Sequence, residues 1–129
     1  MWQALRNELH DQGLEIVTVA LDANVAAARG IIERHPPLHP SVIDAEHTVD
    51  ALFGIVNVPM GVWIDEQGVI VRPPEPAFPA RASYGDIPIS DKLPQRVQDM
   101  LLEARKIRTD PEKYTNALRD WVADGDASR

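Results

Sequence analysis

A proline at the entrance of a strand-like run is the feature that most limits how this chain folds. Residues 54–71 read GIVNVPMGVWIDEQGVIV, in which two apolar runs flank a turn made by Glu66, Gln67 and Gly68. This pattern predicts a β-hairpin. Proline has no backbone N–H to give to a sheet, so it is tolerated only at the start of a strand or at an edge. The sequence therefore places Pro59 at the mouth of the first hairpin strand.

The first residues of the chain predict a helix followed by a buried strand. Trp2, Leu5 and Leu9 recur at helical spacing among polar residues, and Gly13 is placed to end the helix. Residues 14–21, LEIVTVAL, form a near-continuous apolar run. Such a run is typical of a strand in a parallel sheet that helices cover on both faces.

Two more helices and a short strand are expected before the hairpin. Asp22 or Asn24 can cap the first of these helices, which the following prolines end. Residues 41–44 predict a short strand, after which Asp44 caps a helix closed by Gly54. The pattern thus alternates helix and strand up to residue 71.

Beyond the hairpin the composition changes. Residues 73–90 are rich in proline and predict a linker. Residues 91–129 hold two helical patterns, the second opened by Asp110 as a cap with Pro111 in the first turn. The short connection between them predicts an antiparallel helical hairpin. The expected division is a core at 1–72, a linker at 73–90 and this hairpin at 91–129.

Composition excludes several classes of function. The chain has 129 residues and no cysteine, so it has no disulfide, thiolate metal ligand or cysteine nucleophile of its own. A net charge of -7 disfavours binding to nucleic acid or to anionic lipid. No apolar stretch reaches transmembrane length, and the first residues do not read as a signal peptide. The expected location of the chain as given is the cytoplasm.

The remaining candidate chemistry favours neither a metal nor catalysis. His35, His39 and His47 lie near Asp44, but the prolines among them keep this segment extended, and we expect no metal site and no cofactor. Asp65 and its neighbours in the hairpin turn are expected to be solvated. No catalytic residue is therefore assigned.

The order of elements resembles the back half of a thioredoxin-like fold. The nearest groups are redoxins of the TlpA/ResA kind and the alkyl hydroperoxide reductase/thiol-specific antioxidant group. The matching residues are GLEIVTVALD (13–22), VIDAEHTVDALFGIVNVP (42–59) and VWIDEQGVIV (62–71). The resemblance implies an α/β three-layer sandwich and a cis peptide bond between Val58 and Pro59. It also implies that Val58 and Pro59 bind an extended substrate, with Val58 offering its backbone.

One departure from the family pattern is large. The family has a central strand and a Cys-x-x-Cys motif before the first helix, which here would precede Met1. We expect an incomplete sandwich with its first strand absent, from truncation or because the chain is a redox-dead relative, and an exported parent stays open. Its unpaired strand edges predict a homo-oligomer formed by strand pairing or exchange.

Two functions remain open at this point. In the first, the intact parent is a thiol-disulfide oxidoreductase or a peroxide-reducing antioxidant protein, and this cysteine-free chain is inactive. In the second, the chain is a non-catalytic interaction module that holds a protein or peptide partner through the cis-proline surface and the helical hairpin.

Overall fold

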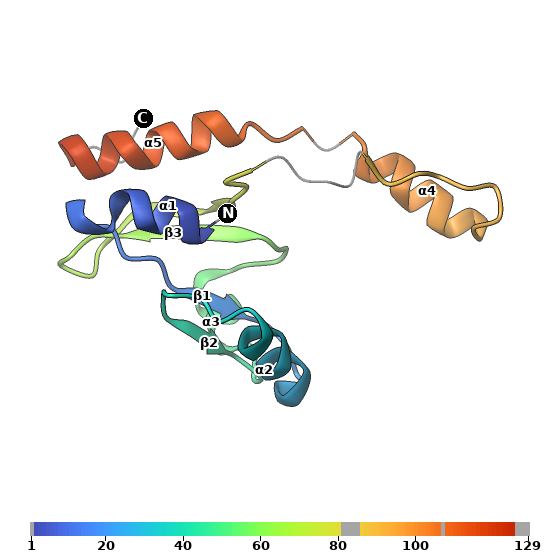
Figure 1. The fold of residues 1–129 in the computed structure, drawn as a ribbon, viewed down its shortest axis with the longest axis horizontal. Helices are drawn as coiled ribbons and strands as arrows, with labels where there is room; N and C mark the ends of the chain where they lie inside the picture. The colour runs from blue at the N-terminus through green and yellow to red at the C-terminus, as the bar shows by residue number, and fades with distance from the viewer. Residues whose placement is uncertain (1, 81–85, 107, 126–129) are drawn as a thin grey trace.

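The computed structural model describes residues 2–80, 86–106 and 108–125. Within these residues the chain is a mixed α/β structure with five α-helices and two two-stranded sheets (Figure 1). The elements in order are α1 (Trp2–Leu9), a 3-10 turn η1 (His10–Gln12), β1 (Thr18–Ala20), α2 (Val25–Arg34), β2 (Ser41–Ile43), α3 (Thr48–Phe53), β3 (Met60–Ile64), β4 (Ile70–Pro76), α4 (Gln95–Ala104) and α5 (Pro111–Asp124).

Several helix ends lie where the local signals predict. Gly13 follows η1 with a φ of 106°, a conformation that glycine adopts without steric penalty. The side chain of Asn24 accepts the N–H of Ala27 and caps α2. Asp44 accepts the N–H of Val49 at 2.6 Å in the first turn of α3. The cap predicted at Asn24 is confirmed, whereas His47 directly precedes α3 and Asp44 bonds to that helix from further upstream.

Strands β1 and β2 pair in parallel. Thr18 lies opposite Ser41 and Ala20 lies opposite Ile43. The sequence predicted a strand over residues 14–21, whereas β1 covers three residues. The reason is that strand structure needs a partner, and β2 is itself only three residues long. Residues 14–17 have no strand beside them in the described part of the chain.

Strands β3 and β4 form the predicted hairpin. They are antiparallel, with Met60 opposite Pro76 and Ile64 opposite Ile70, and the register shifts between these pairs. Gly68 takes a φ of 80° in the turn. β4 runs on to Pro76, so its last residues belong to the segment predicted as a linker. The prolines are compatible with a strand here because β4 lies at the edge of the sheet.

The main core lies between the hairpin and two helices on one of its faces. It consists of six buried residues: Leu5, Leu9, Leu14, Trp63, Ala117 and Leu118. α1 and α5 therefore cover the same side of β3, as Figure 1 shows. An ion pair also joins these helices, because Arg119 donates to both carboxylate oxygens of Glu8.

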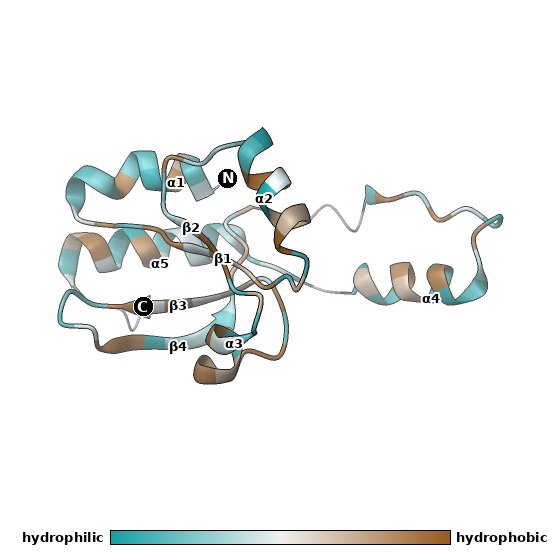
Figure 2. Ribbon diagram, turned by 90° about the horizontal axis from the view of Figure 1, so that it is seen from below, coloured by the Kyte–Doolittle hydropathy of each residue, from teal (hydrophilic) through white to brown (hydrophobic). Residues whose placement is uncertain are grey.

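The structure corrects the expected C-terminal helical hairpin. α5 packs against α1, whereas α4 lies apart from the other elements in both Figure 1 and Figure 2. α5 places Tyr114 and Trp121 against Trp63 in the core that it shares with α1. The predicted division at 1–72, 73–90 and 91–129 stays a prediction, and residues 81–85, 107 and 126–129 of its last two segments lie outside the described residues.

The surface of the chain is large for its mass. A folded monomer of 14.3 kDa normally exposes about 6,800 Å², whereas this chain exposes 9055 Å². The separate α4 and the division of the strands into two sheets both add surface. The chain thus buries less surface than a typical folded monomer of the same mass.

Substitution of two glycines by alanine is expected to change stability in opposite directions. A Cβ at Gly61 would lie 2.8 Å from Tyr114 Oη and 3.0 Å from the Cβ of Ala77, which is buried. We expect Gly61→Ala to lower the free energy of unfolding by about 1–3 kcal/mol, as measured by urea denaturation.

Gly30→Ala is the matched control. Gly30 lies inside α2, and a Cβ there meets nothing within 4 Å. Alanine is expected to raise the free energy of unfolding by about 0.5–1 kcal/mol because it is the better helix former. Equal changes of the same sign in both variants would contradict the packing described for Gly61.

Candidate functional site

The turn that leads into β3 is the site that the sequence singled out. α3 ends at Gly54, which has a φ of 68°, and the chain then reaches Pro59 at the mouth of the hairpin. The peptide bond between Val58 and Pro59 is cis, as the resemblance implies. The carbonyl oxygen of Pro59 accepts the N–H of Ala77 at 3.1 Å. This bond ties the turn to the end of β4.

Val58 presents its backbone at the surface. Its residue is 65% exposed, and its N–H donates to the side-chain oxygen of Asn57 at 2.9 Å. Its carbonyl oxygen accepts no hydrogen bond from any residue that the structure describes. The turn therefore offers one open acceptor and one amide held only by a neighbouring side chain. The binding roles of Val58 and Pro59 stay predictions.

An aromatic cluster supports this turn from the covered side of the hairpin. Trp63 is 3% exposed and stacks on Trp121 with ring centres 5.1 Å apart. Its indole N–H donates to Tyr114 Oη at 3.0 Å, and Trp2 meets the same tyrosine edge to face. Trp63 therefore packs in the core. Tyr114 and Trp121 both come from α5, and no sequence signal shows that they meet Trp63.

The charged groups beside this cluster are already paired. The guanidinium of Arg72 lies 4.5 Å from the centre of the Trp63 ring, and its Nε is 2.8 Å from Glu75 Oε1. Burial raises the pKa of Tyr114, so its phenol stays protonated at neutral pH. These contacts stabilise the hairpin and offer no free acid or base for catalysis.

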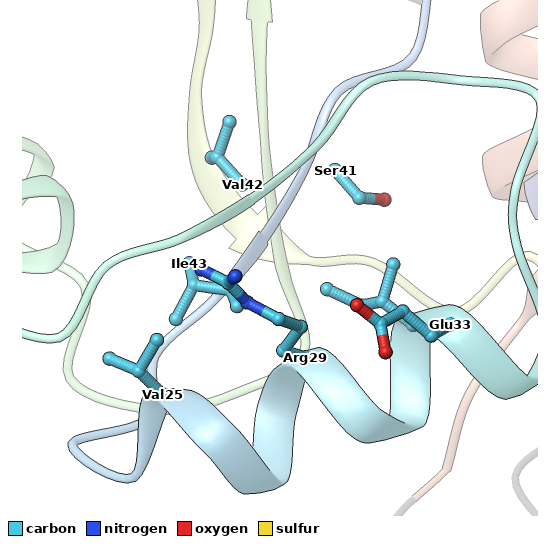
Figure 3. Close-up of a pocket in the computed structure, with 7 residues that line it drawn as sticks. Val25, Arg29, Glu33, Ser41, Val42 and Ile43 are labelled. Atoms are coloured by element: carbon cyan, nitrogen blue, oxygen red, sulfur yellow. The ribbon is translucent and has the colours of Figure 1, made fainter.

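A second feature is a groove between α2 and β2. Its volume is about 510 Å³, and its lining residues are Val25, Arg29, Ile32, Glu33, Ser41, Val42 and Ile43. Figure 3 shows Arg29 and Glu33 rising from α2 toward the strand. The hydroxyl groups of Ser41 and Thr18 are hydrogen-bonded, with 2.6 Å between their oxygens. Neither Val58 nor Pro59 lines this groove.

The histidines that the sequence weighed as metal ligands do not share a site. His39 is buried, with its Nδ1 3.2 Å from the carbonyl oxygen of Pro40. His47 pairs with Asp50 at 3.0 Å, and His35 is exposed. No three histidine, aspartate or glutamate side chains are grouped for a metal ion within the described ranges.

Comparison of the chain with protein-family models, with curated proteins and with solved structures found no match. The likeness to redoxins thus depends on the motifs in the sequence. None of the helices in the described ranges has both the length and the apolar composition needed to cross a bilayer.

Replacement of Tyr114 by phenylalanine tests the contact behind the turn. Tyr114→Phe leaves the buried indole N–H of Trp63 without its acceptor, so we expect the free energy of unfolding at pH 7 to fall by about 1–3 kcal/mol. Urea denaturation gives this difference, and equal stability of the two proteins would contradict the contact.

The same variant also tests the pKa of Tyr114. Because burial raises this pKa in the folded state, the group contributes stability that is fully present below the unfolded pKa of about 10. That contribution is lost as the pH rises through the higher folded pKa. We expect wild type to lose stability more steeply than Tyr114→Phe above about pH 10.

Proposed function

We propose that this chain is a thioredoxin-like domain of the redoxin type that binds extended polypeptide at Val58 and Pro59. The order helix, strand, helix, strand, helix and hairpin supports this proposal, as does the placement of α1 and α5 on one face of the hairpin. The proposal requires a three-layer architecture, with helices on both faces of a sheet, that one more strand would complete.

The open carbonyl of Val58 is the observation that carries the proposal. It lies directly before β3, where an extended ligand running beside the chain can donate an N–H to it. The ligand can also displace the side chain of Asn57 and accept the N–H of Val58. Recognition of this kind is strand addition, in which main-chain hydrogen bonds supply the affinity.

The proposed domain binds but does not carry out thiol chemistry. Disulfide exchange and peroxide reduction need a thiolate, and the chain has no cysteine. The intact parent, a thiol-disulfide oxidoreductase or a peroxide-reducing protein, would bring that thiolate on a separate segment. A Cys-x-x-Cys encoded in frame before Met1 would favour this enzyme.

A non-catalytic interaction module is the second candidate. It is favoured by α4, which lies apart and leaves apolar side chains uncovered, with Met100 60% and Leu102 49% exposed. The partner in either case is a protein or a peptide.

Removal of the Asn57 side chain tests the role of Val58. Asn57→Ala frees the N–H of Val58, so we expect a reduced and alkylated insulin B chain to bind about 2–10-fold more tightly, which is the contribution of one hydrogen bond. Titration calorimetry or fluorescence anisotropy gives the affinity. Asn7→Ala on α1 is the control, because Asn7 is also exposed and bonds only to Gln3. An unchanged affinity in Asn57→Ala would count against binding at this turn.

We also propose that the free chain self-associates through its unpaired strand edges. Light scattering at micromolar concentration is expected to give a mass above 14.3 kDa. Val17→Lys, next to β1, should shift the mass toward the monomer because a lysine discourages edge pairing. Val69→Lys is the control, since Val69 is similarly exposed but lies in the hairpin turn. A clean monomer for wild type would refute self-association.

A further inference from the structure

The groove between α2 and β2 has the size and the lining of a small-molecule site. Its volume of about 510 Å³ lies within the range of roughly 300–1,000 Å³ that is usual for such sites. Its walls combine apolar side chains with a few polar ones, as the walls of ligand pockets do. The apolar part is uncovered, with Val25 37% and Val42 47% exposed. The groove therefore has room for a ligand that the turn at Pro59 does not hold.

One wall of the groove is a single face of α2. Val25, Arg29 and Glu33 follow one another at intervals of four residues, so they share this face in successive turns. All three line the groove, and Figure 3 shows them rising from the helix toward β2. Along this wall the ligand would meet an apolar side chain, a cation and an anion, in that order.

The cation and the anion do not neutralise each other. The side chains of Arg29 and Glu33 form no ion pair and no hydrogen bond within the part of the chain that the structure describes. An acidic residue four positions before a basic one is the better arrangement on a helix, and here the order is reversed. Both charges therefore remain available to a ligand.

The second wall adds a hydroxyl group that is held in place. The oxygens of Ser41 and Thr18 are 2.6 Å apart, so a hydrogen bond fixes the position of the Ser41 hydroxyl. A hydroxyl group can donate one hydrogen bond and accept two. Ser41 therefore keeps the capacity for a further hydrogen bond to a ligand in the groove.

The two ends of the groove differ in polarity. In Figure 3, Ile43 lies on the side of Val25, whereas Ser41 lies on the side of Glu33. One end thus carries two apolar side chains, and the other carries a hydroxyl and a carboxylate. Arg29 lies between these ends along α2.

We propose that this groove binds a free α-amino acid with an apolar side chain. The carboxylate of the ligand pairs with the guanidinium of Arg29, which can donate two parallel N–H bonds to it. The ammonium group of the ligand donates to the carboxylate of Glu33 and to the hydroxyl of Ser41. Its apolar side chain lies between Val25 and Ile43.

A free amino acid fits this arrangement better than a singly charged ligand or a segment of a peptide. An anion without an ammonium group is repelled by Glu33, and a cation without a carboxylate is repelled by Arg29. A residue inside a peptide offers neither charge. The inference depends only on this groove and does not require the thioredoxin-like assignment or binding at Val58.

L-leucine is the probe, and amide NMR spectra of the isotope-labelled full chain report its binding. We expect saturable shifts of the amides in α2 and β2. Three analogues each remove one feature: N-acetyl-L-leucine has no ammonium group, L-leucinamide has no carboxylate and glycine has no apolar side chain. Each should bind at least about tenfold more weakly, since a charge-assisted hydrogen bond or a buried leucine side chain contributes about that much.

Protein variants test the two charges separately. Arg29→Gln and Glu33→Gln should each weaken the binding of leucine at least about tenfold. Arg34→Gln is the control for the first, because Arg34 is exposed on the same helix but outside the groove. Glu66→Gln is the control for the second, because Glu66 is exposed in the hairpin turn. Each control makes the same change in net charge as its partner and should bind leucine as wild type does.

Three results would overturn the inference. The first is the absence of saturable shifts in α2 and β2 up to the solubility limit of leucine. The second is equal affinity for leucine and N-acetyl-L-leucine, which would indicate the last residue of a peptide as the ligand. The third is an equal effect of Arg29→Gln and Arg34→Gln, which would indicate a response to net charge alone.

The variant Asn57→Ala separates this groove from the turn at Val58. We expect it to bind leucine as wild type does, because Asn57 does not line the groove. Loss of leucine binding in Asn57→Ala would place leucine at the turn and overturn the inference. Unchanged leucine binding together with an unchanged affinity for the insulin B chain would count against the proposed function and leave the groove as a separate site.

Discussion

Backbone hydrogen bonding along the unpaired edges of β1 and β3, one on each strand, is the constraint on which the rest of the structure depends. Each of these strands is paired along one edge only. An amide buried without a partner is costly, so a strand edge of this kind stays exposed or takes a partner. Apolar side chains in or next to these two strands are exposed, among them Val17 at 57% and Ile64 at 45%. The division of the strands into two sheets adds to the surface of the chain, as the separate α4 does.

The hairpin keeps its shape without a complete sheet because of Trp63. This side chain brings α5 to the hairpin through Trp121 and Tyr114, and α5 in turn is joined to α1. The aromatic contacts lie on the covered face of β3, while Val58 beside Pro59 is exposed. A rigid hairpin with one open edge is suited to binding an extended chain, because little of the binding site has to be ordered on binding.

The sequence predicted local features well because their signals lie within a few residues. The caps at Asn24 and Asp110 and the turn at Gly68 depend on side chains and backbone angles in the same segment. The length of β1 and the position of α4 were predicted wrongly because both depend on partners distant in sequence. A strand pattern shows that a segment can pair, but not whether a neighbour is present to pair with it.

The candidate site divides in the same way. Pro59 is visible in the sequence because a proline beside an apolar run restricts where a strand begins. The bond from Val58 to Asn57 and the groove beside Arg29 leave no sequence signal, since they arise from the path of the backbone and from packing between elements. The prolines of β4 are visible in the sequence, but their place on the edge strand of a hairpin becomes clear only once the strand pairing is known.

Hydrogen exchange at single-amide resolution most directly tests whether β1 and β3 each have an unpaired edge. In dilute solution, where the free chain is monomeric, the account predicts fast exchange for the amides of Val19 and Val62 and at least tenfold slower exchange for those of Thr18 and Gly61, which point to paired strands. Equal protection of all four amides would contradict the account, because it would mean that the amides of Val19 and Val62 also have hydrogen-bond partners.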